Sequence, residues 1–136
     1  MDYHLGRLID HVHLRAHDLD ASKRFYRAVL AALNRTSSIR EGAAYFSADE
    51  LWIDRADGQS SKVHLAFQAT DQAQVQAFYE AALSAGGRDN GAPGERTYHP
   101  GYYAAFVLDP DGNNIEAVFH GSATRSAESI VVTPRV

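Results

Sequence analysis

Two stretches of the chain repeat one order of polar and apolar positions. Residues 9–15 and 63–69 are short, bounded runs rich in apolar residues, which is typical of strands. Each run is followed by mostly apolar positions at helical spacing. These positions are Leu19, Ser22, Tyr26, Val29 and Leu33 in the first stretch, and Val75, Phe78, Tyr79 and Ala82 in the second. The pattern therefore predicts a strand followed by a helix, twice.

The two stretches also match residue by residue. An offset of 53 residues pairs His11 with His64 and Asp18 with Asp71. The same offset pairs Phe25-Tyr26 with Phe78-Tyr79, Ala16 with Ala69, Ala28 with Ala81, and Leu30 with Leu83. One register that holds over about 20 residues favours duplication of a structural unit.

The helix ends carry their own signals. Asp18 and Asp71 stand where an N-cap is expected, since a carboxylate there accepts from the first unpaired N–H groups. Gly86-Gly87 provides a stop for the second helix. We therefore expect the two helices to begin directly after the two aspartates.

Further strand candidates follow each helix. In the first unit they are residues 35–40, 43–48 and 50–55. In the second they are a weak segment near Arg88, then 103–108 and 114–119, joined by the turn sequence Asp-Pro-Asp-Gly-Asn. Each unit thus reads βαβββ, with a polar hinge at residues 56–61. The predicted fold is α+β, with two tandem βαβββ modules forming a cupped mixed sheet.

The predicted domain organisation is a single domain over residues 1–121 and a tail over residues 122–136. Module one covers about residues 8–56 and module two about residues 62–120. The tail is rich in serine, alanine and threonine and carries Val131-Val132 near its end. It is either loose or packed on another subunit.

Composition narrows the classes of function. The 136 residues contain no cysteine, which excludes disulfides, thiolate nucleophiles and thiolate metal sites. The net charge is -4 and the basic residues are scattered, so we expect no nucleic-acid partner. No apolar run approaches the roughly 20 residues that span a bilayer, so we expect no membrane partner. The N-terminus has no secretory pattern, which makes the cytoplasm the expected location.

The repeat singles out two of the seven histidines. A lone histidine on a strand is more often a structural or surface residue than a ligand. His11 and His64, however, hold the same position in the two modules. If the modules pair about a pseudo-twofold axis, the two imidazoles approach each other, and neutral imidazoles are good ligands for a divalent metal.

Glu116 is the candidate third ligand, and the pattern leaves two interpretations open. A carboxylate buried in the apolar strand around it is costly unless it is paired or bound to metal. Strand alternation also allows the opposite case, in which Ile115, Ala117 and Phe119 are buried while Glu116 faces water together with His120.

Other residues are candidates for the surroundings of the site. His13 shares a face with His11, and His120 shares one with Glu116; each either contacts a ligand residue or lines the pocket. His99 lies in a loop, with Tyr102 and Tyr103, that is either a lip over the pocket or a plain turn. Asp54 is either a fourth ligand or a surface aspartate near the hinge.

These motifs together resemble the vicinal oxygen chelate superfamily. That superfamily includes glyoxalase I, fosfomycin-resistance and bleomycin-resistance proteins, and extradiol dioxygenases. The resemblance covers about residues 8–120. It is carried by Asp10-His11-Val-His-Leu, Asp18-Leu19 with Phe25-Tyr26, Val63-His64-Leu-Ala-Phe, and Phe106-Val-Leu-Asp-Pro-Asp-Gly-Asn-Asn-Ile-Glu116. Residues 86–94 and 99–103 resemble an uncharacterised glyoxalase-like subgroup.

The resemblance implies a metal site and a range of chemistry. In metal-using members the ligands match His11, His64 and Glu116. Glyoxalase I has a second glutamate ligand in its first module. The matching position here is Asp54, whose side chain is shorter. Bleomycin-binding members have no catalytic metal, and the presence of all three ligand types here argues against that branch. A homodimer is expected, and the modules either pair within one chain or swap between chains.

The leading hypothesis is a metal-dependent enzyme that binds adjacent oxygens of a small substrate, as a glyoxalase-type lyase or an extradiol-type dioxygenase. The ion would be Fe, Mn, Ni, Co or Zn, and Glu116 would also move protons. The alternative is a non-catalytic module that binds an antibiotic or another small molecule. A transferase acting on an antibiotic epoxide ranks lower, since no basic cluster for a phosphonate is evident.

Overall fold

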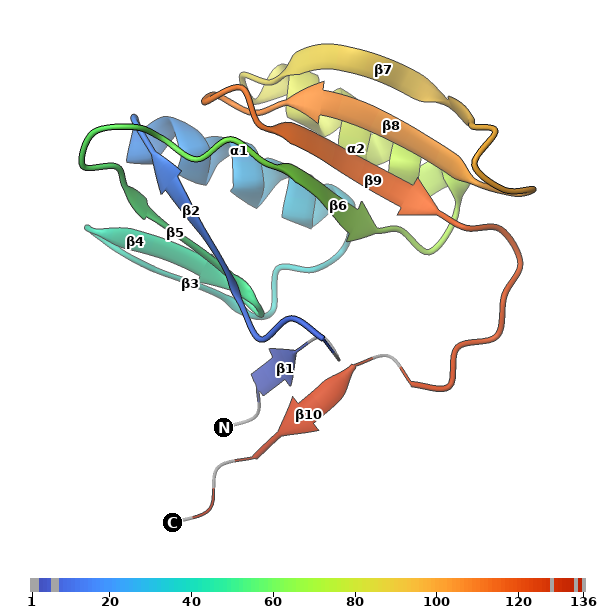
Figure 1. Ribbon diagram of the computed structural model, residues 1–136, viewed down its shortest axis with the longest axis horizontal. Coiled ribbons are helices and arrows are strands. Elements are labelled where there is room, and N and C mark those ends of the chain that lie inside the picture. Colours follow the sequence, from blue (N-terminus) through green and yellow to red (C-terminus); the bar gives the residue numbers. More distant parts are fainter. Residues whose placement is uncertain (1–2, 6–7, 128, 134, 136) are drawn as a thin grey trace.

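The computed structural model describes residues 3–5, 8–127, 129–133 and 135. Two modules follow one another along the chain, and each combines one helix with a four-stranded mixed sheet (Figure 1). The predicted α+β fold with two tandem βαβββ modules is therefore confirmed. The two sheets are hydrogen-bonded separately, each with its own strand order.

The first strand of module one lies at the edge of its sheet, and the last strand of the module pairs with it. Its elements are β2 (Val12–Ala16), α1 (Leu19–Ala32), β3 (Ile39–Gly42), β4 (Tyr45–Ala48) and β5 (Leu51–Arg55). The sheet order is β2-β5-β4-β3, in which β2 and β5 run parallel and the other pairs are antiparallel. The last strand of the module therefore lies beside the first.

Module two repeats this topology. Its elements are β6 (His64–Gln68), α2 (Gln72–Ser84), β7 (Arg88–Glu95), β8 (Tyr103–Leu108) and β9 (Asn114–Phe119), in the order β6-β9-β8-β7. The weak segment near Arg88 is the long edge strand β7, whose pairing with β8 is irregular. Its two glycines and one proline explain the weak strand signal, because both residue types are disfavoured in regular strands.

The helices form where the sequence predicts them. The side chain of Asp18 accepts from the N–H of Ala21, and the side chain of Asp71 accepts from that of Gln74, so both aspartates are N-caps. All five positions predicted for the apolar face of α1 are buried. Of the four predicted for α2, Tyr79 is half-buried and the other three are fully buried.

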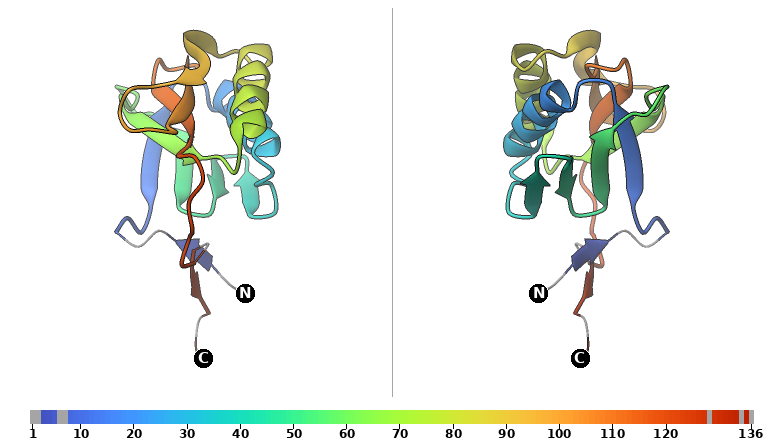
Figure 2. Two further views of the ribbon diagram at one scale, coloured as in Figure 1. Left: turned by 90° about the vertical axis from the view of Figure 1, so that its right-hand side faces the viewer. Right: turned by 90° about the vertical axis from the view of Figure 1, so that its left-hand side faces the viewer.

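Both helices lie on the same side of the two sheets and pack against each other (Figure 2). Their apolar faces and the facing strands form one hydrophobic core that spans both modules. A polar link crosses the same boundary: Tyr26 of α1 donates to Asp109, 2.5 Å away, in the turn between β8 and β9. Asp109 is buried and also accepts from the backbone N–H groups of Asp111 and Asn113.

Two short strands lie outside the modules. The strand β1 (Tyr3–Leu5) pairs antiparallel with β10 (Ile130–Val132), and this ribbon projects from the rest of the molecule (Figure 1). The end of the tail thus pairs with the start of the same chain. Residues 128, 134 and 136 of the predicted tail, and Met1 and Asp2 of the N-terminal segment, lie outside the described residues. Neither described helix is long and apolar enough to cross a membrane.

Candidate functional site

Each sheet has one face against the helices and one open face. In module one, Leu14 and Ile53 point toward the helices and are buried, so alternation turns His13 and Trp52 to the open face. In module two, Ile115 and Ala117 point toward the helices, which turns Glu116 to the open face. The candidate residues of the two modules therefore lie on corresponding surfaces.

Glu116 is buried although it lies on the open face. It is only 1% exposed, and its carboxylate has two partners. His64 Nε2 lies 2.8 Å from Oε1, and the hydroxyl of Tyr102 donates to Oε2. Of the two interpretations that the sequence left open, the buried and paired carboxylate is the correct one. The cover comes from β8, whose Ala104 and Phe106 pack with Val118 and Tyr102 over this face.

The imidazole of His64 lies at the border between this cluster and solvent. Its side chain is 52% exposed, while that of Glu116 is 2% exposed. Burial, followed by the hydrogen bond to Glu116, raises the pKa of Tyr102 to about 12. Tyr102 is therefore a neutral donor to the carboxylate at physiological pH. The arrangement presents one imidazole nitrogen and one carboxylate oxygen side by side, with solvent access from the His64 side.

His99 and His120 form a second pair behind Tyr102. His99 Nε2 lies 2.9 Å from His120 Nδ1, which ties the loop before β8 to the end of β9. The ring of Tyr102 makes edge-on contacts with both imidazoles. The loop, which turns at residues 97–101, therefore holds Tyr102 over Glu116, and its role as a lip over a pocket stays a prediction.

Tyr103 is not part of this cluster. It follows Tyr102 by one residue, so alternation turns it to the helix side, where it packs against the main core. Its hydroxyl accepts from Gln76 Nε2 of α2 at 3.0 Å. The structure thus separates two tyrosines that the sequence grouped together.

Module one holds a different histidine–carboxylate pair. His13 Nε2 lies 2.8 Å from Asp54 Oδ1, and Arg15 Nε lies 3.7 Å from the same oxygen. Burial raises the pKa of Asp54, but the hydrogen bond and charge of His13 outweigh it, so the pKa lies below its ordinary value. Asp54 is therefore a carboxylate paired within its own module.

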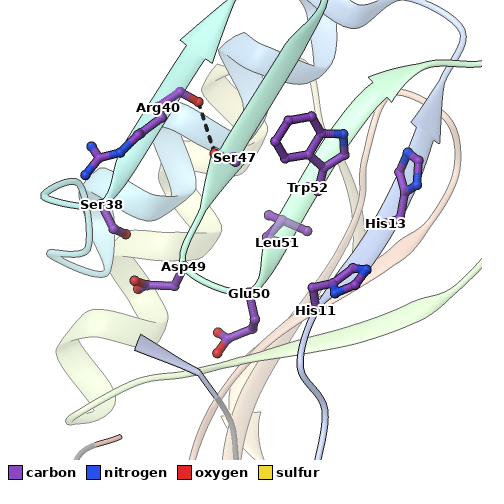
Figure 3. Close-up of a pocket in the computed structure, with 9 residues that line it drawn as sticks. All are labelled: His11, His13, Ser38, Arg40, Ser47, Asp49, Glu50, Leu51 and Trp52. Atoms are coloured by element: carbon purple, nitrogen blue, oxygen red, sulfur yellow. Dashed lines mark hydrogen bonds between the residues drawn. The ribbon is translucent and has the colours of Figure 1, made fainter. Parts of the chain in front are cut away.

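His11 lies just before β2, and its Nδ1 is 2.7 Å from Asp10 Oδ1. Its side chain is exposed, and together with His13 it lines a pocket on the open face of module one (Figure 3). Among the residues that the structure describes, no three His, Asp or Glu side chains are grouped closely enough to hold a metal ion. A single chain thus brings His64 and Glu116 together and leaves His11 apart from them.

The strand register shows which residue of module one corresponds to Glu116. In module two, Ala66 is paired with Glu116, and in module one His13 is paired with Trp52. Because the repeat offset of 53 matches His13 to Ala66, the counterpart of Glu116 is Trp52 and not Asp54. The sequence could not show this, since a match between two Ile-containing strands does not specify how each pairs with its neighbour.

Several pocket residues escaped the sequence analysis. The strand pattern gives Trp52 no role beyond membership of the strand that carries Asp54. Because its neighbours Leu51 and Ile53 are buried, alternation turns Trp52 to the open face, where His13 also lies. The other polar members lie just before β3, in β3, in β4 and in the turn between β4 and β5. They are Ser38, Arg40, Ser47, Asp49 and Glu50. Only the pairing of distant strands brings them beside His11 and His13.

Comparison with known proteins identifies the fold independently. Residues 8–117 match the family model of the Glyoxalase/Bleomycin resistance protein/Dioxygenase superfamily. This range runs from the start of module one into β9, the last strand of module two. It includes His11, His64 and Glu116 and excludes the β1–β10 ribbon. No curated protein matches the sequence.

Solved structures share the architecture. A glyoxalase/bleomycin resistance protein from Albidiferax ferrireducens T118 is 29% identical, with a TM-score of 0.68 over 82% of this chain and 97% of that one. A glyoxalase-related enzyme from Fulvimarina pelagi is 19% identical, with a TM-score of 0.70 over 95% and 99%. A lactoylglutathione lyase from Agrobacterium tumefaciens is 22% identical, with a TM-score of 0.59 over 82% and 92%.

Proposed function

Since the chain belongs to the Glyoxalase/Bleomycin resistance protein/Dioxygenase superfamily, we propose that it is a metal-dependent enzyme acting on a small substrate with adjacent oxygens. The observation that carries the proposal is the pair formed by His64 and the buried Glu116. A glyoxalase-type lyase and an extradiol-type dioxygenase are the two reaction classes that fit this site.

The donor atoms fit two ligands of one divalent ion. The 2.8 Å between His64 Nε2 and Glu116 Oε1 is close to the separation of neighbouring ligands that each lie about 2.0–2.2 Å from one ion. Glu116 receives a further hydrogen bond from Tyr102, as ligating carboxylates commonly do from a neighbouring group. Imidazole and carboxylate suit Fe, Mn, Ni, Co and Zn, and nothing in the donor set selects among them.

We assign the third position to His11 of a second copy of this chain. Within one chain, no third His, Asp or Glu among the described residues joins His64 and Glu116. His11 is exposed at the edge of module one, where its imidazole is accessible to another molecule. A homodimer in which each module one faces a module two of the other copy would complete two equivalent sites.

Each residue then has a defined role. The bound ion would supply Lewis acidity to two adjacent substrate oxygens. Glu116 would present Oε1 to the ion, since Tyr102 occupies Oε2 from the covered side, and it would accept a substrate proton at Oε1 when that oxygen leaves the ion. The loop tied by His99 and His120 limits access of water from the side of Tyr102. The exposed edge of His64 marks the side from which substrate enters.

Metal analysis tests the proposal directly. Purified protein should contain one divalent ion per chain, and both His64→Ala and His11→Ala should reduce that content severely. His17→Ala is the matched control, because His17 is exposed and is not one of the predicted ligands. Unchanged metal content in the first two variants would contradict the metal site.

Mixing the two variants tests which copy supplies His11. A dimer of one His11→Ala chain and one His64→Ala chain retains one intact site if the ligands come from different copies. Co-refolding the two variants should therefore restore about a quarter of the native metal content, by random pairing. Failure to restore any metal, with each variant still folded and dimeric, would show that one chain supplies all three ligands.

A non-catalytic binding protein is the second candidate function. It is favoured by the pocket on module one, whose lining includes an exposed tryptophan. It predicts ligand binding that a chelator leaves unchanged and no turnover with any metal. Binding that requires the metal, together with product formation, would exclude it.

A further inference from the structure

The pocket on module one has the size of a small-molecule site. Its volume is about 490 Å³, which is in the range of roughly 300–1,000 Å³ found for ligand pockets. Four of its side chains form one row across the sheet, because His13 is paired with Trp52, Trp52 with Ser47, and Ser47 with Arg40. The row lies on the open face, away from the core.

Trp52 lies in the middle of this row and is the sole tryptophan of the chain (Figure 3). Its indole is stacked on Tyr45 with ring centroids 4.7 Å apart and an angle of 2° between the planes. Trp52 remains 38% exposed, and it lines the pocket while Tyr45 does not. A flat aromatic surface is thus presented to the pocket.

The stack is held in place by the backbone beneath it. Tyr45 is paired with Gly42 on β3, and a Cβ added at Gly42 would lie 2.8 Å from Cε1 of Tyr45. The tyrosine ring therefore covers the glycine directly and supports the indole from the other side. A surface that is rigid before binding loses little conformational entropy when a ligand stacks on it.

The polar groups around the aromatic surface include both basic and acidic side chains. His11 and His13 lie on one side of Trp52, and the hydroxyls of Ser38 and Ser47 lie on the other. The lining also holds one guanidinium, of Arg40, and two carboxylates, of Asp49 and Glu50, so its charges are of both signs. This lining suits hydroxyl or keto groups on a ring better than a strongly charged ligand.

We propose that this pocket binds a planar aromatic ring that carries hydroxyl or keto oxygens, with the ring stacked on Trp52. A small aliphatic substrate would leave the indole exposed, whereas a ring of matching shape buries it and gains the stacking interaction. The oxygens would point toward His11, and that direction alone rests on the proposed function. Stacking on Trp52 itself requires no metal.

The test uses chelator-treated native protein and two probes with the same carbon skeleton. One is 2-naphthol, and the other is its saturated counterpart decahydro-2-naphthol. The single indole N–H resonance of Trp52 in a proton–nitrogen correlation spectrum reports contact at the site. We expect 2-naphthol to shift this resonance saturably and decahydro-2-naphthol to shift it at concentrations about tenfold higher. Equal response to both probes, or none to either, would overturn the proposal.

Variants measured by equilibrium dialysis give an independent test. Trp52→Leu should weaken 2-naphthol binding about tenfold, and Trp52→Phe should weaken it less. Tyr98→Leu is the matched control, because Tyr98 is 70% exposed in module two and does not line this pocket. Equal affinity in Trp52→Leu and native protein would overturn the proposal. Should Trp52→Leu fail to fold, the resonance of the native protein decides the question alone.

The two proposals fail in different ways. Loss of metal from His64→Ala with 2-naphthol binding retained would support both, since His64 lies outside the pocket. Native protein that binds no metal but stacks 2-naphthol on Trp52 would reject the metal site and keep the aromatic site. Native protein that binds metal but does not bind 2-naphthol would keep the metal site and reject the aromatic site.

Discussion

The two modules share a helix, a strand order and a parallel pair of first and last strands, but their open faces differ in chemistry. At the corresponding position in the middle of each sheet, module two carries Glu116 and module one carries Trp52. The carboxylate is covered by Tyr102 and Phe106, whereas the indole is exposed on a pocket. One scaffold thus presents a buried glutamate side chain in one half and an aromatic surface in the other.

The repeat does not imply two equal half-sites, because the two faces of each sheet are constrained differently. The positions that face the helices are under the same packing constraint in both modules, so they stay apolar. The open faces have no such constraint, and their side chains are free to diverge. We interpret module two as the part that holds the metal and module one as the part that supplies His11 and receives the substrate ring.

The largest effect should come from exchanging carboxylates for amides in the two modules. Glu116→Gln should lower the affinity for divalent metal by about 100-fold, since even partners of ligands contribute 10–100-fold. Asp54→Asn should change it by less than about threefold, because Asp54 is paired with His13 and Arg15. Calorimetric titration with Co²⁺ or Ni²⁺ measures both. A large loss in Asp54→Asn would show that module one also supplies a ligand.

The link between the modules should have the next largest effect. Tyr26→Phe removes the donor to the buried Asp109 and should destabilise the chain by about 1–3 kcal/mol in urea unfolding. Burial, and then the charge of Asp109, raise the pKa of Tyr26 well above its ordinary value. The stabilisation is therefore complete below about pH 10 and is lost as the pH rises further.

The same variant supplies the control for that pH dependence. Native protein should lose stability above about pH 10 more steeply than Tyr26→Phe does. Val12→Ala, a substitution at a half-buried residue with no titrating group, should lower stability at every pH without changing this slope. Parallel pH profiles for native protein and Tyr26→Phe would show that the two modules are not coupled through this hydroxyl.

A smaller effect is expected from the hydroxyl over Glu116. Tyr102→Phe keeps the ring contacts with His99 and His120 and removes only the hydrogen bond to the carboxylate. Metal affinity should fall about tenfold, while binding of 2-naphthol to module one should stay the same. Tyr98→Phe serves as control. A loss of 2-naphthol binding in Tyr102→Phe would mean that the open faces of modules one and two contribute to one site.

The smallest effect should come from the support beneath Trp52. Gly42→Ala places a methyl group against Tyr45 and should tilt the stack, which would weaken 2-naphthol binding about threefold. Metal affinity should not change. Tyr45→Phe keeps the ring and should bind 2-naphthol as the native chain does. Unchanged binding in Gly42→Ala would show that the indole keeps its position without support from Tyr45.

Local features of the chain were predictable because their causes are local. The N-cap aspartates, the apolar face of α1 and the turn after β8 depend on residues close in sequence, and all lie where the pattern placed them. The pairing of His11 with His64 in the repeat also followed from the residues alone. The candidate metal site beyond this pair depended on the resemblance to a known family.

The duplicated module, its helices and the histidine at the start of the first strand of each module could be predicted from the residues alone. The burial of Glu116, and its correspondence to Trp52 and not to Asp54, follow from how the strands pack and pair. The same packing brings only two of the three candidate ligands together within one chain. The physical reason is that burial and register are set by contacts between strands far apart in sequence, and such contacts leave no periodic signal in either strand.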